Sequence, residues 1–365
     1  MQMKKMPSLA GIIKAIRTYP GLTRKAPIRE VVEALSITPN AYMGLDIIAD
    51  FGDDAAAVRL PEPVAGKITA DKDRDGGLVY LLAADGIMQS LIDHDPYWAG
   101  YCSVLVNVND IAAMGGLPIG MVNVISARNG KVLAKMIQGM REGCEKFGVP
   151  MLGGHTHPDA DHDSIAVSIF GVAHEGSVIC SHTARPGDAI LFVFDLEGMI
   201  TPGIPYSWDN TSMRTPREVQ SRIKAMNALG ERDLVNSGKD ISNPGMLGTL
   251  GMLLETSNVG GIIDLAKIPY PPRFEFIHWL TVYHGCGFVL TAPSENVGKI
   301  TRLLGKHGIT VAPCGEVTRK RQLVLGHPSG GTGVLFDLSK DVISGARPSF
   351  LTRRKPAARA KRNSN

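Results

Sequence analysis

Apolar residues recur at helical spacing in the N-terminal half of the chain. The first such face is formed by Leu9, Ile12, Ile13 and Ile16. A second short helix is expected from Pro27 to residue 35, because proline suits the first turn of a helix. Longer helices are predicted within 97–114 and 131–147, each followed by glycine, which favours helix termination.

Short apolar runs between these helices have the length and alternation of strands. They predict strands at 55–60, 78–84, 119–126, 149–152 and 164–173. The turn at 182–188 then begins a second series, with strands at 189–196, 262–265, 287–293 and 310–317 and helices near 216–229, 245–255 and 295–308. Strands mixed with helices in both halves predict a two-lobed α/β or α+β protein.

Composition agrees with two folded lobes and a polar end. With 365 residues, of which 44% are hydrophobic, the chain is longer than one ordinary domain needs. We divide it into an N-terminal helix and loop (1–26), an N-terminal lobe (27–180), a C-terminal lobe (181–343) and a basic tail expected to be disordered (344–365).

Cysteine usage and hydropathy narrow the class of protein. The five cysteines are widely spaced without a CxxC pair, which argues against a disulfide framework or a zinc ribbon. No apolar run reaches membrane-spanning length, so we expect a cytoplasmic protein without a membrane partner. The net charge of +4 is modest and aromatic residues are few, so a nucleic-acid role has little support.

Four aspartates end or interrupt apolar stretches, where a charge needs a reason. They are Asp54, Asp85, Asp110 and Asp240. The chain has neither a GxxxxGK[ST] loop nor a GxGxxG that opens a helix after a strand. Carboxylate oxygens suit Mg²⁺, which takes further ligands from the phosphates of a bound nucleotide. A metal-bridged triphosphate is therefore possible without a phosphate loop.

Asp110 is the most informative of the four aspartates. Asn107 precedes it by three residues, so both lie on one helical face in an otherwise apolar segment. A buried polar pair is unfavourable unless it is satisfied. Asp110 alone could still cap the glycine turn that follows, and Asp54 and Asp85 could each lie in a solvated turn. The four together carry more weight than any one of them.

Seven segments in order resemble the aminoimidazole ribonucleotide synthetase-related superfamily, which includes thiamine-monophosphate kinase and selenophosphate synthetase. The segments are GDDAAAV, AADGI, NVNDIAAMGGLP, GVPMLGGHTHP, ARPGD, DISNPGMLGTLGMLLE and GCGFVLTAP. The resemblance implies a homodimer whose N-terminal lobes pair into a β-barrel. It also implies ATP and Mg²⁺ bound by Asp54, Asp85, Asp110 and Asp240, with Asn107, Gly153, Gly154 and His155 in the nucleotide site.

The chain departs from each named branch. It reads His155 after the glycine pair where thiamine-monophosphate kinase has an aspartate, and it has no cysteine before Cys102, unlike the reactive loop of selenophosphate synthetase. The segment HTHPDADHD, with His155, His157 and His162, is interpreted as a polar loop at the mouth of the site. A phosphate contact by His155 and a transition-metal site are the alternatives.

The sequence therefore predicts a Mg²⁺-dependent, ATP-binding phosphotransferase or synthetase that acts on an unidentified small molecule. Such catalysis relies on positioning and electrostatics, so it needs no conspicuous nucleophile. Two alternatives stay open. One is thiamine-monophosphate kinase, and the other is a nucleotide-binding subunit or sensor without turnover.

Overall fold

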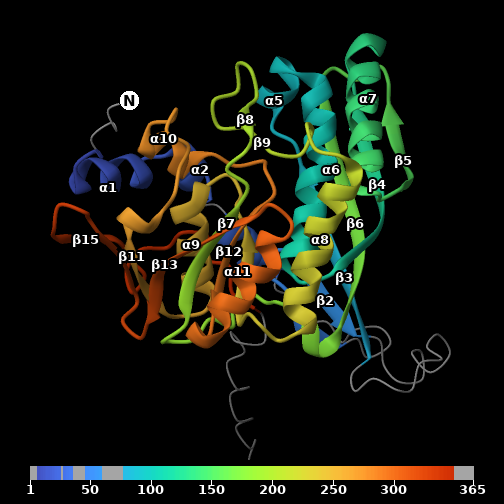
Figure 1. The fold of residues 1–365 in the computed structure, drawn as a ribbon. Helices are drawn as coiled ribbons and strands as arrows, with labels where there is room; N and C mark the ends of the chain where they lie inside the picture. Colours follow the sequence, from blue (N-terminus) through green and yellow to red (C-terminus); the bar gives the residue numbers. More distant parts are fainter. Residues whose placement is uncertain (1–5, 26–27, 36–45, 60–76, 349–365) are drawn as a thin grey trace, which may run out of the picture.

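The chain folds around two β-sheets that lie in different halves of the sequence (Figure 1). The computed structural model describes residues 6–25, 28–35, 46–59 and 77–348. The predicted basic tail lies almost wholly outside these residues. In the described part, no helix has the length and apolar character needed to span a membrane.

The first sheet has six strands in the order β1-β2-β3-β6-β4-β5. All neighbours are antiparallel except β4 and β5, which run parallel. The strands are β1 (Asp46–Ala49), β2 (Ala56–Arg59), β3 (Leu78–Gly86), β4 (Leu117–Ser126), β5 (Met151–His157) and β6 (Ser164–His174). In one chain this sheet is open, so the dimeric barrel stays a prediction.

The second sheet has seven strands in the order β10-β12-β7-β13-β11-β14-β15. They are β7 (Ala189–Phe194), β10 (Ser237–Asp240), β11 (Gly260–Asp264), β12 (Gly287–Ala292), β13 (Thr310–Thr318), β14 (Gln322–Gly326) and β15 (Thr332–Asp337). A separate short hairpin joins β8 (Met199–Ile200) to β9 (Trp208–Asp209). The two sheets fall within the predicted lobes, whose boundaries remain a proposal.

Local sequence explains the two long helices of the first half, α6 (Pro96–Ala113) and α7 (Gly130–Phe147). Asp95 caps α6 by accepting hydrogen bonds from the backbone N–H groups of Tyr97 and Trp98, both at 3.1 Å. Helix α7 is capped by Asn129 and ends at Gly148, whose φ of 70° suits a residue without Cβ. The predicted helices at these places are confirmed.

The other helices are shorter or cover the second sheet. They are α1 (Leu9–Arg17), α2 (Pro20–Thr23), α3 (Ile28–Leu35), α5 (Gln89–His94), α8 (Pro216–Glu231), α9 (Gly245–Thr256), α10 (Phe276–Thr281) and α11 (Val297–Gly305). Helix α1 contacts α10 and β15, so the N-terminal segment packs on the C-terminal half. This placement was not predicted.

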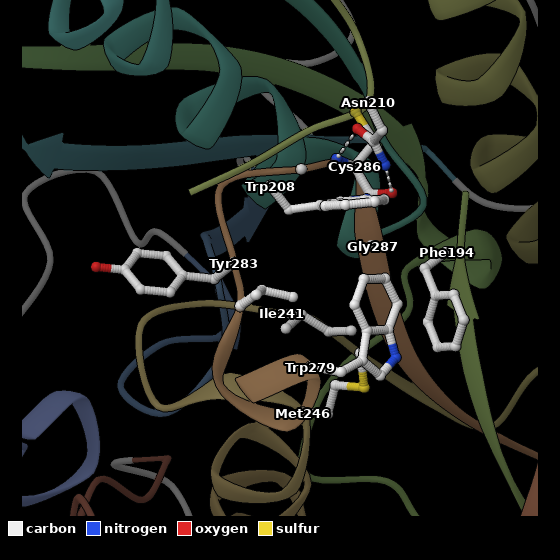
Figure 2. A pocket seen from close by; sticks show the side chains of 11 residues that line it. Phe194, Trp208, Asn210, Ile241, Met246, Trp279, Tyr283, Cys286 and Gly287 are labelled. Atoms are coloured by element: carbon white, nitrogen blue, oxygen red, sulfur yellow. Dashed lines mark hydrogen bonds between the residues drawn. The ribbon is translucent and has the colours of Figure 1, made fainter. Parts of the chain in front are cut away.

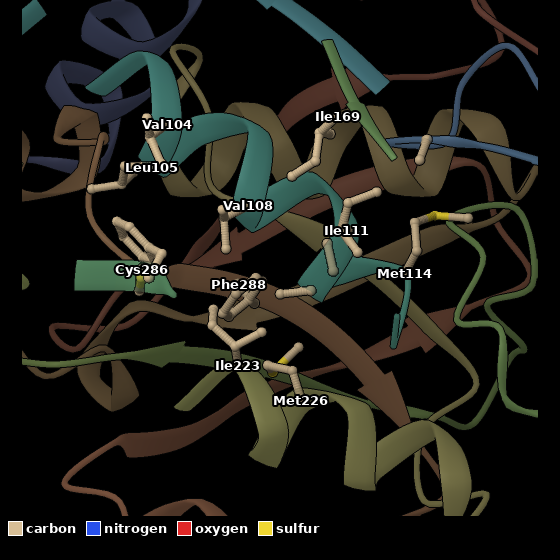
Figure 3. Close-up of a cluster of buried hydrophobic side chains, with 14 of the residues drawn as sticks. Val104, Leu105, Val108, Ile111, Met114, Ile169, Ile223, Met226, Cys286 and Phe288 are labelled. Atoms are coloured by element: carbon tan, nitrogen blue, oxygen red, sulfur yellow. The ribbon is translucent and has the colours of Figure 1, made fainter. Parts of the chain in front are cut away.

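Helix α6 is buried on almost all sides and connects the two halves (Figure 3). Val108 and Ile111 belong to one buried cluster with Ile169 of β6. Ile223 of α8 and Phe288 of β12 belong to the same cluster. The helix contacts β3 and β6 as well as α8 and β10. Its last turn therefore ends where the two halves meet, and Asp110 lies in that turn.

Candidate functional site

Three of the predicted aspartates converge at the junction of the two halves. Asp54 precedes β2, Asp110 lies in the last turn of α6, and Asp240 ends β10. Each offers a carboxylate oxygen, and these oxygens all lie within 4.8 Å of one another. Asp110 and Asp240 are only 8% and 7% exposed, so the group is enclosed by protein. Spacing of this kind allows one cation to contact all three.

One lysine partly compensates the negative charge. Lys239 forms an ion pair with Asp54, and the backbone N–H of Asp240 donates to the other oxygen of Asp54 at 3.0 Å. Among the described residues, no salt bridge joins Asp110 or Asp240 to a lysine or arginine. Two buried carboxylates therefore remain without a strong counter-charge, which is unfavourable unless they bind protons or a cation.

The pKa values of these carboxylates are therefore raised, so that they bind protons more tightly. Burial raises the pKa of Asp110 and of Asp240 well above the ordinary range, and neighbouring carboxylates raise them further. Burial also raises the pKa of Asp54, although Lys239 opposes this effect. Asp85 is an exposed residue of β3. The protein around its carboxyl group nevertheless reduces hydration of the charged form, and this raises the pKa of Asp85 to about 6. A bound divalent cation would reverse these shifts.

A pocket of about 100 Å³ lies beside the carboxylates and is lined from both halves of the chain. Its polar lining comprises Lys25, Asp85, Asn109, Asp240, Ser242, Asn243, Tyr283 and His284. The side-chain oxygens of Asn109 and Asn243 are buried without a hydrogen-bond partner in the described structure. Buried polar atoms are normally satisfied, so these oxygens are candidates for contact with a ligand or its water.

His284 stands out within this lining. Its φ is 73°, a conformation that residues with a Cβ adopt at an energetic cost, and its Nδ1 is buried without a partner. Burial lowers the pKa of His284 to about 3, so the imidazole is neutral. Local strain together with an unsatisfied nitrogen at a pocket wall is typical of a residue held for ligand contact.

The turn that carries His284 borders a small apolar cavity (Figure 2). The cavity has a volume of about 20 Å³, and its walls include Trp208, Trp279 and Met246. Asn210 fixes the turn, because it donates to the carbonyl of Cys286 at 3.2 Å and accepts from the Cys286 N–H at 2.9 Å. Aromatic packing thus supports the strained turn from behind.

Asn107 is buried on the same helix as Asp110 but does not line the pocket. Its Nδ2 donates to the carbonyl of Ser103 at 2.9 Å. Asn109 lines the pocket instead and donates to the carbonyl of Gly285 at 3.0 Å. The expected role of Asn107 in nucleotide binding therefore stays a prediction.

The glycine pair and His155 lie elsewhere in the same chain. Asp85 pairs with Val167, Val167 with Asn123 and Asn123 with Gly154, so Asp85 and Gly154 are three strands apart, or about 14 Å. Val167 is buried on the helix-covered face, which Asp85 shares. The neighbouring pair of His155 with Val124 places both on the opposite, exposed face. Within a single chain, His155 therefore lies away from the cluster of Asp54, Asp110 and Asp240.

The predicted histidine-rich loop is wrong in its first part, because His155 and His157 lie in β5, and the segment forms no convergent metal-ligand group in the described residues. His155 and His157 contact each other edge to face with ring centroids 4.5 Å apart, and His162 pairs with Asp161 at 2.6 Å. The second convergent group in the described chain is Asp53, Cys180 and His182.

That second group has a structural explanation. Asp53 accepts from the hydroxyl of Ser181 at 2.8 Å and from His182 Nδ1 at 2.9 Å, so its carboxylate is already satisfied. Burial raises the pKa of the Cys180 thiol well above its ordinary value. A neutral thiol and a satisfied carboxylate anchor the segment between the two sheets.

Sequence reasoning missed four residues of the site. Lys239 could have been found, because it is a second charge directly before Asp240. Asn109, Lys25 and His284 gave no such signal. Burial and the nearby Lys239 lower the pKa of Lys25, which comes from the N-terminal segment. Only the packing of that segment against the second half brings it to the pocket.

The raised pKa values predict how pH will affect Mg²⁺ binding. An acid with a raised pKa in the folded state binds more protons when folded, so the metal-free protein should lose stability as pH rises from about 4 through 6 and above. Mg²⁺ competes with those protons. We expect Mg²⁺ to raise the melting temperature more at about pH 8 than at about pH 5. Thermal unfolding with Mg²⁺ or EDTA checks this, and an equal shift at both pH values would contradict it.

Fold and site together define a mixed α/β protein with a carboxylate-lined pocket where the two halves of the chain meet. The N-terminal domain model of the AIR synthase related proteins matches residues 52–173, and the C-terminal domain model matches residues 186–327. The chain belongs to the AIR synthase related family, which confirms the resemblance seen in the sequence.

Curated relatives extend over most of the chain. An uncharacterised protein of Methanocaldococcus jannaschii is 44% identical over 93% of this chain and 99% of its own length. Thiamine-monophosphate kinase of Escherichia coli is 24% identical over 75% of this chain and 85% of its own length. Selenide, water dikinase of Carboxydothermus hydrogenoformans is 27% identical over 63% of each chain.

Solved structures share the fold. Thermotoga maritima PurL complexed with AMPPCP superposes with a TM-score of 0.68 at 16% identity, covering 92% of this chain and 53% of that longer one. AaThiL complexed with AMPPCP and TMP gives a TM-score of 0.58 at 17% identity, covering 85% of this chain and 94% of that chain. The relatives named above thus include two kinases, and both of these solved structures hold AMPPCP.

Proposed function

We propose that this protein binds ATP through Mg²⁺ held by Asp54, Asp85, Asp110 and Asp240, and that it transfers a phosphoryl group to a small molecule. The observation that carries the proposal is the convergence of three buried carboxylates with a single paired lysine. Mg²⁺ suits this ligand set, and the phosphates of ATP would complete its coordination. The named kinase relatives and the AMPPCP complexes of similar folds support the same chemistry.

Two lysines have distinct tasks in this proposal. Lys239 opposes the rise in the pKa of Asp54, since it is paired with that carboxylate. Lys25 lines the open pocket beside Asp85 and Asp240, where it would meet phosphate oxygens. Metal and lysine together would neutralise the charge of the transferring phosphoryl group.

Calorimetric titration of ATP, with Mg²⁺ and with EDTA, tests the binding half of the proposal. We expect ATP to bind at the carboxylate pocket in Mg²⁺ and not to bind there in EDTA, because buried carboxylates repel bare phosphates. ATP consumption over a panel of acceptors, including thiamine monophosphate, tests the transfer half. Binding without consumption over the whole panel would favour the alternative of a silent nucleotide-binding subunit.

We also propose that the protein is a homodimer formed through the first sheet. The face opposite α6 carries exposed apolar side chains on three strands, namely Leu82, Val122, Val124 and Leu152. An uncovered apolar sheet face of this kind favours association with a second surface. His155 lies on this face, so pairing of two such faces would place it near the second chain.

Replacing Val124 with lysine should separate the two chains. A charge at the centre of a buried sheet interface would be desolvated without a partner. Light scattering should give twice the chain mass of 39.1 kDa for the wild type and the mass of one chain for Val124→Lys. Ile137→Lys, which changes an equally exposed side chain on α7, should leave the mass unchanged. A wild-type monomer would contradict the dimer.

A further inference from the structure

Helices α8 and α11 pack beside each other on the surface of the C-terminal half (Figure 1). Between them lies an open groove of about 590 Å³. The α8 wall comprises Ser221, Lys224, Ala225, Ala228 and Arg232, and the other wall comprises Lys299, Arg302, Leu303, Lys306 and His307. None of these residues lines the carboxylate pocket.

The groove is strongly and uniformly basic. Its five lysine and arginine side chains are all exposed, and its lining contains no carboxylate. In the described part of the chain, none of the five takes part in a salt bridge. Their positive charges therefore add together at the groove.

Helix stability does not explain this arrangement. Lys299 lies in the first turn of α11, where the helix dipole disfavours a cation. Lys299, Arg302 and Lys306 follow one another at spacings of three and four residues, at which like charges repel. A favourable dipole interaction is available only to the cations near the C-terminal end of the helix.

Small side chains make the groove concave. Ala225 and Ala228 form the part of the α8 wall between its two cations. Ser221 and His307 lie within hydrogen-bond distance of each other at 3.0 Å and add polar groups to the same lining. The lining contains no phenylalanine, tyrosine or tryptophan, so none of these rings is available in the groove for base stacking.

We propose that this groove is a second anion site, which binds a small ligand carrying several linked phosphate groups. The α11 cations from Lys299 to Lys306 extend over about 10 Å, which suits an extended oligophosphate better than a single small anion. The volume lies within the range of small-molecule sites. Recognition rests on phosphate charge, whether the phosphates belong to an inorganic chain or to a nucleotide.

Inorganic triphosphate in EDTA tests this proposal separately from the ATP site. Without metal, the buried carboxylates should repel triphosphate, whereas the groove should still bind it. Calorimetry on the full chain should detect one triphosphate per chain, with an affinity that falls as salt is added. Lys299→Gln/Lys306→Gln should weaken binding by about tenfold or more. Adding ATP in EDTA as a competitor reports whether a nucleotide uses the same site.

A matched variant controls for total charge. Lys131→Gln/Lys135→Gln removes two exposed lysines from α7 and should bind triphosphate as the wild type does. Equal weakening in both double variants would overturn the proposal, as would no binding by the wild type. Tighter binding of a poly-glutamate peptide than of triphosphate would also overturn it, in favour of an acidic protein segment. Asp110→Asn should leave triphosphate binding in EDTA intact, so failure of the ATP site is distinguishable.

Discussion

Asp110→Asn should abolish Mg²⁺-dependent ATP binding and yet stabilise the metal-free protein. Asp110 is buried beside Asp54 and Asp240, and the described residues provide no cationic partner for it. Removing its charge weakens cation binding, and we expect ATP affinity in Mg²⁺ to fall by at least about a hundredfold. The same change relieves repulsion between buried carboxylates, so the melting temperature in EDTA should rise.

The opposite signs of these two effects separate a metal site from a structural one. A helix-capping role for Asp110, which the sequence left open, would make Asp110→Asn less stable or neutral in EDTA. Glu145→Gln removes a 63%-exposed carboxylate from α7 and should change neither property. Unchanged ATP affinity in folded Asp110→Asn would remove Asp110 from the site.

Lys239→Met should strongly destabilise the metal-free protein. The lysine is 8% exposed and is ion-paired with Asp54, whose side chain is 3% exposed. Loss of one partner leaves a buried charge uncompensated, and breaking such pairs lowers the free energy of unfolding by about 3–5 kcal/mol. Urea unfolding in EDTA measures this difference directly.

Mg²⁺ should restore part of that stability, because the variant has one more uncompensated negative charge for the metal to neutralise. Lys340→Met is a suitable control. It breaks an exposed pair with Asp337, and we expect a change within about 0.5 kcal/mol. If Lys239→Met is as stable as the wild type in EDTA, Lys239 does not compensate the cluster.

Much of the fold could be predicted because its elements carry local signals. Helices α6 and α7 are apolar or amphipathic and stop at glycines with positive φ, so pattern and termination agree. Strand β6 alternates buried and accessible residues along its length, as its sequence indicates. Strand β10 was missed, since SGKD has no strand pattern and pairs only because β12 lies beside it.

The candidate site could likewise be predicted only in part. The anomalous aspartates could be identified from the sequence alone, because a carboxylate inside an apolar run is visible without any structure. Their convergence within 4.8 Å depends on contacts between segments up to 186 residues apart, which local pattern does not encode.

Tertiary structure also decided which other groups join those aspartates. Lys25 reaches the pocket because its segment packs on the second half, and His284 does so because its turn is held by Asn210. His155 is adjacent to the glycine pair in sequence but faces away from the carboxylates of its own chain, since side chains alternate between the two faces of a sheet. The sequence thus specifies which chemical groups are available, and the pairing of strands and the packing of α6 determine which of these groups meet at the site.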